Sequence, residues 1–116
     1  MIHKFLFILL FKQVTFKWTK RPVTQRNSEQ YLQTPYFRYG HTCVYYSEHE
    51  LIYLWGGRSD FTPYLCNNLF SYDPKTHMWS KVKCANSPPN GRDGHTATVI
   101  GNSMYIFGGY VQLVIL

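Results

Sequence analysis

Three arginines stand at positions where a loop could bind an anion. Arg38 and Arg92 each come two residues before a Gly-His pair, and Arg58 comes directly after a Gly pair. A planar guanidinium group holds a carboxylate through two parallel hydrogen bonds. Asp60 and Tyr64 follow Arg58 and complete our set of candidate ligand-binding residues. The alternative for each arginine is an exposed or loop-ordering role.

Residues able to carry out catalysis do not form a motif in this sequence. The three cysteines, Cys43, Cys66 and Cys84, are odd in number and far apart, which favours free thiols in reducing surroundings such as cytoplasm or nucleus. There is no Cys-x-x-Cys, no His-x-x-x-His and no Gly-x-x-x-x-Gly-Lys. We therefore expect no enzyme activity, no metal site and no cofactor.

The basic charge lies mostly at the N-terminal end. The first 35 residues hold six Lys and Arg against one acidic residue, whereas the remainder holds six against five, within a total net charge of +6. The nearly neutral remainder disfavours a nucleic-acid partner, so a chromatin-associated role is only an alternative. Aromatic residues make up 18% of the chain and charged residues 16%, which predicts a folded protein with buried rings.

Both ends of the chain are apolar. Residues 5–11 form a seven-residue apolar run that is too short to span a bilayer. This run predicts a buried strand, or the apolar part of a signal peptide, which would make the protein secreted. Residues 111–116 form an uncharged apolar tail that favours association of strands.

Two stretches of the sequence repeat each other. Residues 38–42 read Arg-Tyr-Gly-His-Thr and residues 92–96 read Arg-Asp-Gly-His-Thr; residues 52–57 and 104–109 both end in an aromatic residue and a Gly pair. The offsets of 54 and 52 residues differ because the second copy has a shorter turn. A period near 50 residues built from short strands is typical of a propeller.

Four short strands fit between the repeated motifs, and no stretch predicts a helix. Alternation and β-branched or aromatic residues place these strands at residues 42–46, 51–55, 68–72 and 78–82, with a turn at 73–76. Four antiparallel strands make one propeller blade. Tyr72 and Trp79 flank the turn on adjoining strands, and we expect their rings to pack between neighbouring sheets and hold blades together. The remaining repeat residues predict close backbone approach at the glycines and hydrogen bonds from the histidines to loop backbone: Gly40, His41, Gly56, Gly57, Gly94, His95, Gly108 and Gly109.

The Gly pair, the Tyr-x6-Trp spacing and the period together resemble the kelch repeat. The resemblance implies an all-β fold, an incomplete kelch-type β-propeller of about two four-stranded antiparallel blades with one complete. Trp18 looks like the closing strand of a preceding blade. The expected division is an atypical apolar and basic segment at 1–15, the end of a preceding blade plus linker at 16–35, a complete blade at 36–88, the start of the next at 89–110, and an apolar tail at 111–116.

The resemblance also implies a function. Kelch propellers serve as protein-interaction modules, and some relatives are substrate receptors of cullin-2 ubiquitin ligases that read acidic or C-terminal peptides. In those proteins, arginines at the positions of Arg38, Arg58 and Arg92 are among the peptide contacts. Binding to a ubiquitin-ligase adaptor protein is expected only if a full-length form of this protein exists. Because propeller blades are stabilised mainly by their neighbours, we also expect marginal stability or association, and a truncated product without independent activity is the remaining hypothesis.

Overall fold

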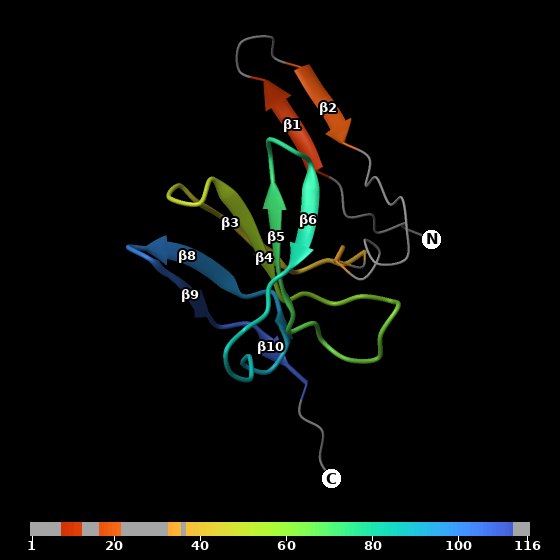
Figure 1. The fold of residues 1–116 in the computed structure, drawn as a ribbon. Helices are drawn as coiled ribbons and strands as arrows, with labels where there is room; N and C mark the ends of the chain where they lie inside the picture. Colours follow the sequence, from red (N-terminus) through yellow and green to blue (C-terminus); the bar gives the residue numbers. More distant parts are fainter. Residues whose placement is uncertain (1–7, 13–16, 22–32, 36, 113–116) are drawn as a thin grey trace.

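The computed structural model describes residues 8–12, 17–21, 33–35 and 37–112. These residues form ten short strands and no helix (Figure 1). Within them, no helix is long and apolar enough to cross a membrane. The all-β class expected from the sequence is confirmed. The predicted tail lies outside the described residues from 113 onward, and so does most of the predicted linker.

One complete blade forms the centre of the molecule. It consists of β3 (Thr42–Tyr46), β4 (Leu51–Trp55), β5 (Leu69–Asp73) and β6 (Met78–Lys81) in the order β3-β4-β5-β6. All neighbours are antiparallel. The first two strands have the bounds that the sequence predicted. β5 begins and ends one residue later than predicted, and β6 ends one residue earlier.

The core of this blade is a cluster of rings around one aliphatic side chain. Leu54 is fully buried and packs with Phe70, Tyr72 and Trp79. Tyr72 lies directly opposite Trp79 on the neighbouring strand, with ring centres 5.0 Å apart and planes at 53°. The two rings therefore lie in the core of one blade, whereas the sequence predicted that they pack between neighbouring sheets. Each such buried side chain contributes roughly 1.5–3 kcal/mol of apolar stabilisation.

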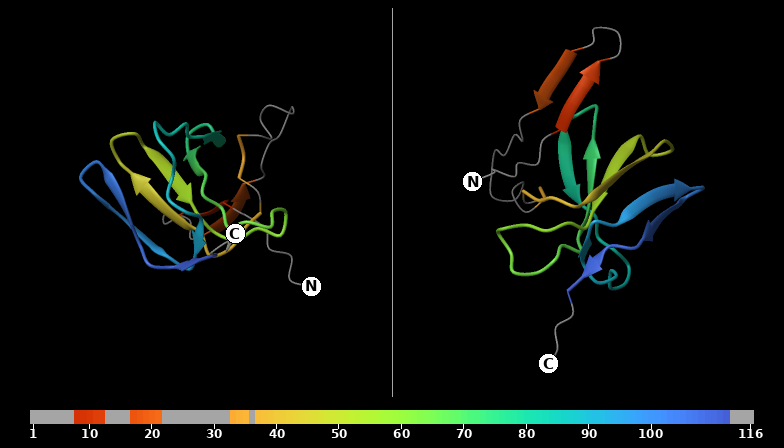
Figure 2. Two further views of the ribbon diagram at one scale, coloured as in Figure 1. Left: turned by 90° about the horizontal axis from the view of Figure 1, so that it is seen from below. Right: turned by 180° about the vertical axis from the view of Figure 1, so that it is seen from behind.

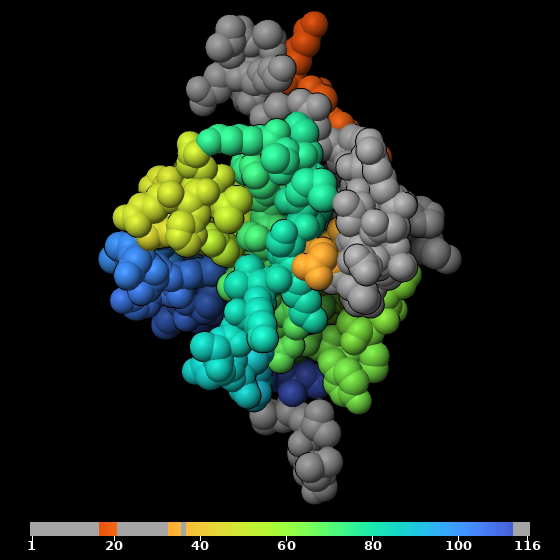
Figure 3. Space-filling model, viewed as in Figure 1, coloured from red at the N-terminus to blue at the C-terminus, as the bar shows by residue number. Residues whose placement is uncertain are grey.

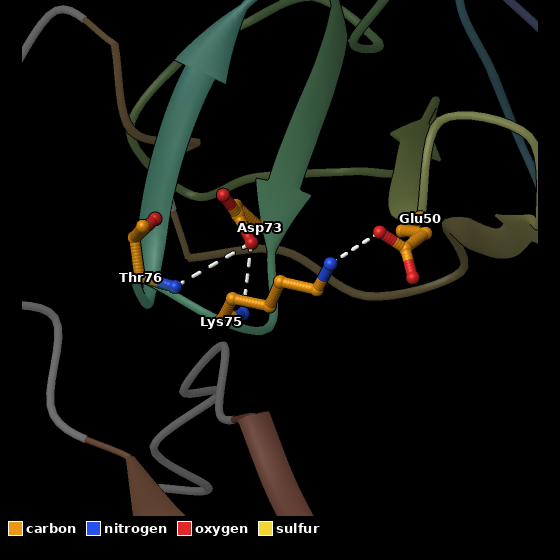
Figure 4. A network of polar contacts seen from close by, with 4 residues as sticks. All are labelled: Glu50, Asp73, Lys75 and Thr76. Carbon is orange, nitrogen blue, oxygen red and sulfur yellow. Dashed lines mark hydrogen bonds and ion pairs between the residues drawn. The ribbon is translucent and has the colours of Figure 1, made fainter.

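The turn between β5 and β6 is held by its first residue. The Asp73 carboxylate accepts the backbone N–H of Lys75 at 2.8 Å and that of Thr76 at 3.4 Å (Figure 4). The bond from Lys75 lowers the pKa of Asp73 below its ordinary value. The Lys75 ammonium extends to the carboxylate of Glu50 in the β3–β4 turn and ties the two turns together.

A second, smaller sheet repeats the first half of the complete blade. β8 (Thr96–Ile100) pairs with β9 (Ser103–Phe107), and this hairpin lies beside β3 (Figures 1 and 2). Next to it, β7 (Arg92–Asp93) pairs with β10 (Tyr110–Val111). Thr96 lies opposite Phe107 as Thr42 lies opposite Trp55. The repeat in the sequence is therefore a repeat in strand pairing.

A hairpin at the N-terminal end has the pairing of the second half of a blade. β1 (Ile8–Lys12) pairs with β2 (Lys17–Arg21), and Phe11 lies opposite Trp18. The apolar run thus contributes a strand, one of the interpretations that the sequence left open. The domain boundary expected between residues 15 and 16 lies outside the described residues.

Candidate functional site

The Gly pair of the complete blade lies in the contact between the two repeats. A Cβ atom on Gly56 would come within 2.8 Å of the carbonyl oxygen of Arg92, and one on Gly57 within 2.9 Å of the carbonyl oxygen of Tyr39. Both glycines also have positive φ, which other residues rarely adopt. The close backbone approach predicted for the pair is confirmed.

Backbone hydrogen bonds join the repeats at this contact. The N–H of Gly57 donates to the carbonyl of Arg92 at 2.7 Å, and the N–H of Gly94 donates to the carbonyl of Gly40 at 2.9 Å. A side chain on Gly56 would push the backbone of Arg92 away and break the first of these bonds. The repeated glycines therefore act in docking one blade on the next.

The second repeat histidine bonds strand residues of the neighbouring repeat, whereas the sequence predicted a bond to loop backbone. His95 is 6% exposed, and its Nε2 lies 2.8 Å from the Thr42 hydroxyl. Its ring also meets Trp55 edge-on with centres 5.1 Å apart. Burial lowers the pKa of His95 and the charge of Arg92 lowers it further, while a hydrogen bond with the Trp55 backbone partly opposes them. The lowered pKa favours the neutral form of His95 within the contact.

The first repeat histidine lies at the corresponding position in the complete blade and is half-buried. The Nδ1 atom of His41 is buried and has no hydrogen-bond partner among the described residues. Burial lowers the pKa of this histidine, and the charge of Arg38 adds to the effect. At this nitrogen, the loop-backbone hydrogen bond expected from the sequence does not form.

Two of the candidate arginines order their own blades. Arg38 is 4% exposed, and its Nη1 donates to the carbonyl of Gly56 at 3.0 Å. Arg92 repeats this bond in the second copy, with Nη1 donating to the carbonyl of Gly108 at 3.2 Å. The guanidinium of Arg38 also covers the Phe70 ring at 5.4 Å. Each arginine thus links the start of the first strand to the end of the second.

The third candidate arginine joins the two repeats. The Nε of Arg58 lies 3.3 Å from the carboxylate of Asp93, and its guanidinium carbon lies 5.7 Å from the centre of the Tyr110 ring. The hydrogen bond to Asp93 raises the pKa of Arg58. Arg58 is therefore engaged between the blades, although its side chain is 39% exposed.

The loop that follows Arg58 is fixed by its own hydroxyl groups. Ser59 donates to the carbonyl of Phe37 at 2.7 Å and accepts the N–H of Phe61 at 3.2 Å. The hydroxyl of Thr62 accepts the N–H of Tyr64 in the same way. These short hydroxyl-to-backbone bonds stabilise tight turns. They hold two aromatic side chains in solvent, Phe61 and Tyr64, at 67% and 65% exposure.

A polar cleft of about 300 Å³ borders this loop. Two predicted residues, Arg38 and Tyr64, line it, whereas Asp60 is exposed on the loop outside the lining. Lys81 on β6 brings a second cation to the cleft, and none of the described residues that line it is acidic. The loop is the green segment at the lower right of the space-filling view (Figure 3). The full lining is Thr34, Arg38, Thr62, Tyr64, Leu65, Cys66, Asn67, Asn68, Phe70 and Lys81.

Sequence reasoning did not find Lys81 or the two asparagines. The pairing of β5 with β6 sets Lys81 opposite Phe70, the residue whose ring Arg38 covers. Alternation along β6 indicated the face of Lys81, but the position of the loop beside that face depends on the fold. Across the described ranges, no three His, Cys, Asp or Glu side chains are grouped so that they could hold a metal ion.

The comparisons with known proteins agree with this architecture. A family model described as the KLHDC2/KLHL20/DRC7 Kelch-repeats domain matches residues 4–114. The chain belongs to the kelch-repeat family. Kelch repeats are protein-interaction modules built as propeller blades, so the chain is an incomplete kelch propeller. The matched range reaches into the apolar sequence at both ends.

Individual relatives show the same family. The chain is 44% identical over 105 residues to kelch domain-containing protein 3 of Bos taurus and 43% identical over 104 residues to that of Homo sapiens. These alignments cover 90% and 89% of this chain. It is also 40% identical over 80 residues, 67% of the chain and 8% of the relative, to the leucine-zipper-like transcriptional regulator 1 homolog of Drosophila melanogaster. The chain spans about a quarter of the length of the kelch domain-containing protein 3 relatives, 27% and 26%.

Proposed function

We propose that the chain binds a peptide segment with a carboxylate, either an acidic side chain or a free C-terminus, in the cleft beside the loop of residues 58–68. The observation that carries this proposal is the charge of the lining. Its described residues include two cations, Arg38 and Lys81, and no acid. A buried guanidinium and an ammonium in one cleft favour an anionic ligand.

The rim of the cleft supports a protein partner. Tyr64 lines the cleft and is largely exposed, and Phe61 stands three residues before it on the same loop. Exposed aromatic side chains around a polar pocket are typical of protein-binding surfaces, where they become buried anchors. The loop needs little ordering on binding, because Ser59 and Thr62 already fix its backbone.

The test measures binding of short peptides of random sequence by the purified 116-residue chain. One pool ends in a free carboxylate and the other is amidated at its C-terminus. Peptides retained from each pool are identified by mass spectrometry, and the affinity of selected sequences is measured by fluorescence polarisation. We expect selected peptides to lose about tenfold in affinity on Lys81→Gln, which is about 1.4 kcal/mol.

The matched control is Lys75→Gln. Lys75 is an exposed lysine that pairs with Glu50 in a turn and does not line the cleft. Tyr64→Ala is expected to weaken binding through lost ring contact without changing the preference for a carboxylate. Equal retention of peptides with neither a free C-terminus nor an acidic residue, or equal loss in the two lysine variants, would overturn the proposal.

The finer proposal follows from the family resemblance. The chain is part of a substrate receptor of a cullin-2 ubiquitin ligase, acting in cytoplasm or nucleus on proteins that present such a carboxylate. Immunoprecipitation of the protein from cells, with mass spectrometry for cullin-2 and its adaptor, tests this role. Recovery without cullin-2, while peptide binding persists, would remove the ligase role and leave the binding function.

A further inference from the structure

A hydroxyl residue stands directly before a proline at three places in the chain. These pairs are Thr34-Pro35, Thr62-Pro63 and Ser87-Pro88. A hydroxyl residue followed by proline is the acceptor sequence of proline-directed serine/threonine kinases. The structure separates the three pairs by their position and by their exposure.

Two of the three hydroxyl residues border the polar cleft beside the loop of residues 58–68. Thr34 and Thr62 both line it, together with Arg38 and Lys81. Ser87 lies in the exposed loop between β6 and β7 and is not part of the lining. Phosphate on either threonine would therefore stand at a cationic cleft, whereas phosphate on Ser87 would not.

Exposure distinguishes the two threonines of the cleft. Pro35 is buried, whereas Pro63 is exposed and Thr62 is partly exposed. A kinase must contact both the acceptor residue and the proline that follows, so Thr62 is the accessible acceptor of the two. Its hydroxyl oxygen accepts the N–H of Tyr64 at 3.2 Å, and this bond leaves one of its two lone pairs for reaction.

The surroundings of Thr62 suit a phosphoryl group. A phosphothreonine carries about −1.5 to −2 charges at pH 7 and three strong acceptor oxygens. The cleft measures about 300 Å³ and has no acid among its described lining residues. Arg38 is 4% exposed there, and a planar guanidinium matches the geometry of a phosphate. Lys81 adds an ammonium that no carboxylate of the described residues pairs with.

We propose that Thr62 is a phosphorylation site of a proline-directed kinase, and that Arg38 and Lys81 hold its phosphate in the cleft and thereby exclude a peptide carboxylate. The exclusion of peptide rests on the function proposed above, whereas the binding of the phosphate does not. The phosphate is tethered to the loop, so it competes with free peptide at an effective concentration on the order of millimolar.

The reaction is a phosphoryl transfer from ATP, supplied with the kinase. The Oγ atom of Thr62 attacks the γ-phosphorus, and the bond from that phosphorus to the oxygen bridging the β-phosphate breaks. ADP leaves with the electron pair of this bond. The hydroxyl proton passes to the catalytic base of the kinase.

The first test is phosphorylation of the purified 116-residue chain by a mitogen-activated protein kinase with ATP and Mg²⁺, with sites mapped by mass spectrometry. We expect phosphate on Thr62 and on the exposed Ser87, but not on Thr34, because Pro35 is buried. A synthetic peptide of residues 58–68 is the positive control for the kinase. A chain that takes no phosphate on Thr62, or takes it as readily on Thr34, would overturn the proposal.

The second test measures the second pKa of each phosphate by phosphorus NMR and needs no peptide ligand. Ser87→Ala provides a chain phosphorylated on Thr62 alone, and Thr62→Ala provides one phosphorylated on Ser87 alone. The pKa of the Ser87 phosphate should be about 6, the value of an exposed phosphate. The pKa of the Thr62 phosphate should lie below it, because Arg38 and Lys81 favour the dianion.

A matched pair of lysine variants assigns the cause. Lys81→Gln should raise the pKa of the Thr62 phosphate towards about 6, whereas Lys75→Gln should leave it unchanged, because Lys75 does not line the cleft. Equal pKa values for the Thr62 and Ser87 phosphates, or equal responses to the two lysine variants, would overturn the binding of the phosphate in the cleft.

The third test compares the two singly phosphorylated chains in fluorescence polarisation with peptides selected on the unmodified chain. Phosphate on Thr62 should weaken peptide binding at least about tenfold, and phosphate on Ser87 should leave it unchanged. Equal affinities of the two chains would overturn the exclusion of peptide. If the unmodified chain selects no carboxylate peptide, the proposed function fails, and the phosphorus titration still decides whether the cleft holds the phosphate. Circular dichroism establishes that each variant is folded.

Discussion

The complete blade and the β8–β9 hairpin share a sequence pattern but differ in burial. Trp55 and Phe107 close the second strand of their copies, yet they are 4% and 81% exposed. Leu54 is fully buried, whereas Ile106 at the same position is partly exposed. The difference arises because β5, β6 and a neighbouring repeat cover the first copy. A repeated residue therefore contributes stability only where neighbours cover it.

The local geometry is the same in both copies. Arg38 and Arg92 donate to the first glycine of their own Gly pairs. Tyr39 forms a bridge with Arg58, and Asp93 pairs with Tyr110 at the equivalent place. Strand pairing and loop hydrogen bonds therefore form without the outer half of a blade. The copies differ in how far these bonds are exposed to water.

The largest expected difference between the copies comes from their aliphatic core positions. Leu54→Ala should lower the free energy of unfolding by about 2–5 kcal/mol, because it leaves a cavity among three rings. Ile106→Ala should cost about 1 kcal/mol or less in dilute monomer, since its side chain is only partly covered. Urea denaturation of both variants measures the difference. Equal losses of unfolding free energy would contradict the claim that the two positions differ in their contribution to stability.

The glycine pairs provide the next contrast. Gly56→Ala should cost about 2–4 kcal/mol, because positive φ is combined with a Cβ that collides with the adjoining repeat. Gly108 also has positive φ, but a Cβ there would have no described atom within 4 Å, so Gly108→Ala should cost only about 1–2 kcal/mol. Thermal unfolding of the two variants under one condition checks the order. A larger loss at Gly108 would contradict the assignment of close contact to Gly56.

The repeat arginines provide a smaller contrast. Arg38→Ala should cost about 1–3 kcal/mol, because it leaves the carbonyl of Gly56 without its buried donor. Arg92→Ala should cost about 1 kcal/mol or less, since water can replace its exposed hydrogen bonds. The free energies of unfolding in urea decide between these roles, and similar costs would show that burial does not separate the two arginines.

The contact between the repeats should also weaken in mild acid. Burial lowers the pKa values of His41 and His95 below the usual 6.5, so the unfolded chain takes up protons that the folded chain resists. Above about pH 6.5 both states are neutral, and the stability of the contact is at its full value. As the pH falls below about 6.5, the unfolded chain binds protons first and the free energy of unfolding decreases. Urea midpoints at about pH 7.5 and about pH 5.5 should show lower stability in acid, with a smaller drop in His95→Gln. If His95→Gln loses as much stability in acid as the unchanged chain, protonation of His95 does not cause the loss.

Much of the fold was predictable from local pattern. Alternation and turn residues located the four strands of the complete blade to within one residue. The same pattern placed Tyr72 and Trp79 on adjoining strands, but their packing within one blade core was not predicted. The N-terminal hairpin was harder to predict from the sequence. The spacing of Phe11 and Trp18 carried the same signal, but a phenylalanine in a continuous apolar run concealed it. Strand pairing made the equivalence visible.

The candidate site was harder to predict than the fold. The sequence suggested Arg38, Arg58 and Arg92 as one set of carboxylate-binding residues, but the structure gives them different partners. Arg38 and Arg92 bond glycine carbonyls, and Arg58 pairs with Asp93 across the repeats. Lys81 reaches the cleft from a strand that carries no loop motif. A sequence motif predicts the position of the backbone, but it does not predict which group a long side chain will contact.

The sequence alone determined the repeat, the strand order within a blade and the positions that favour glycine, because these depend on neighbours close along the chain. Tertiary structure decided which rings are buried, which arginines are occupied and where a ligand cleft lies. Those properties depend on contacts between segments such as residues 38, 64 and 81, which local pattern does not bring together. The same dependence on distant neighbours explains why matching motifs are buried in one copy and exposed in the other.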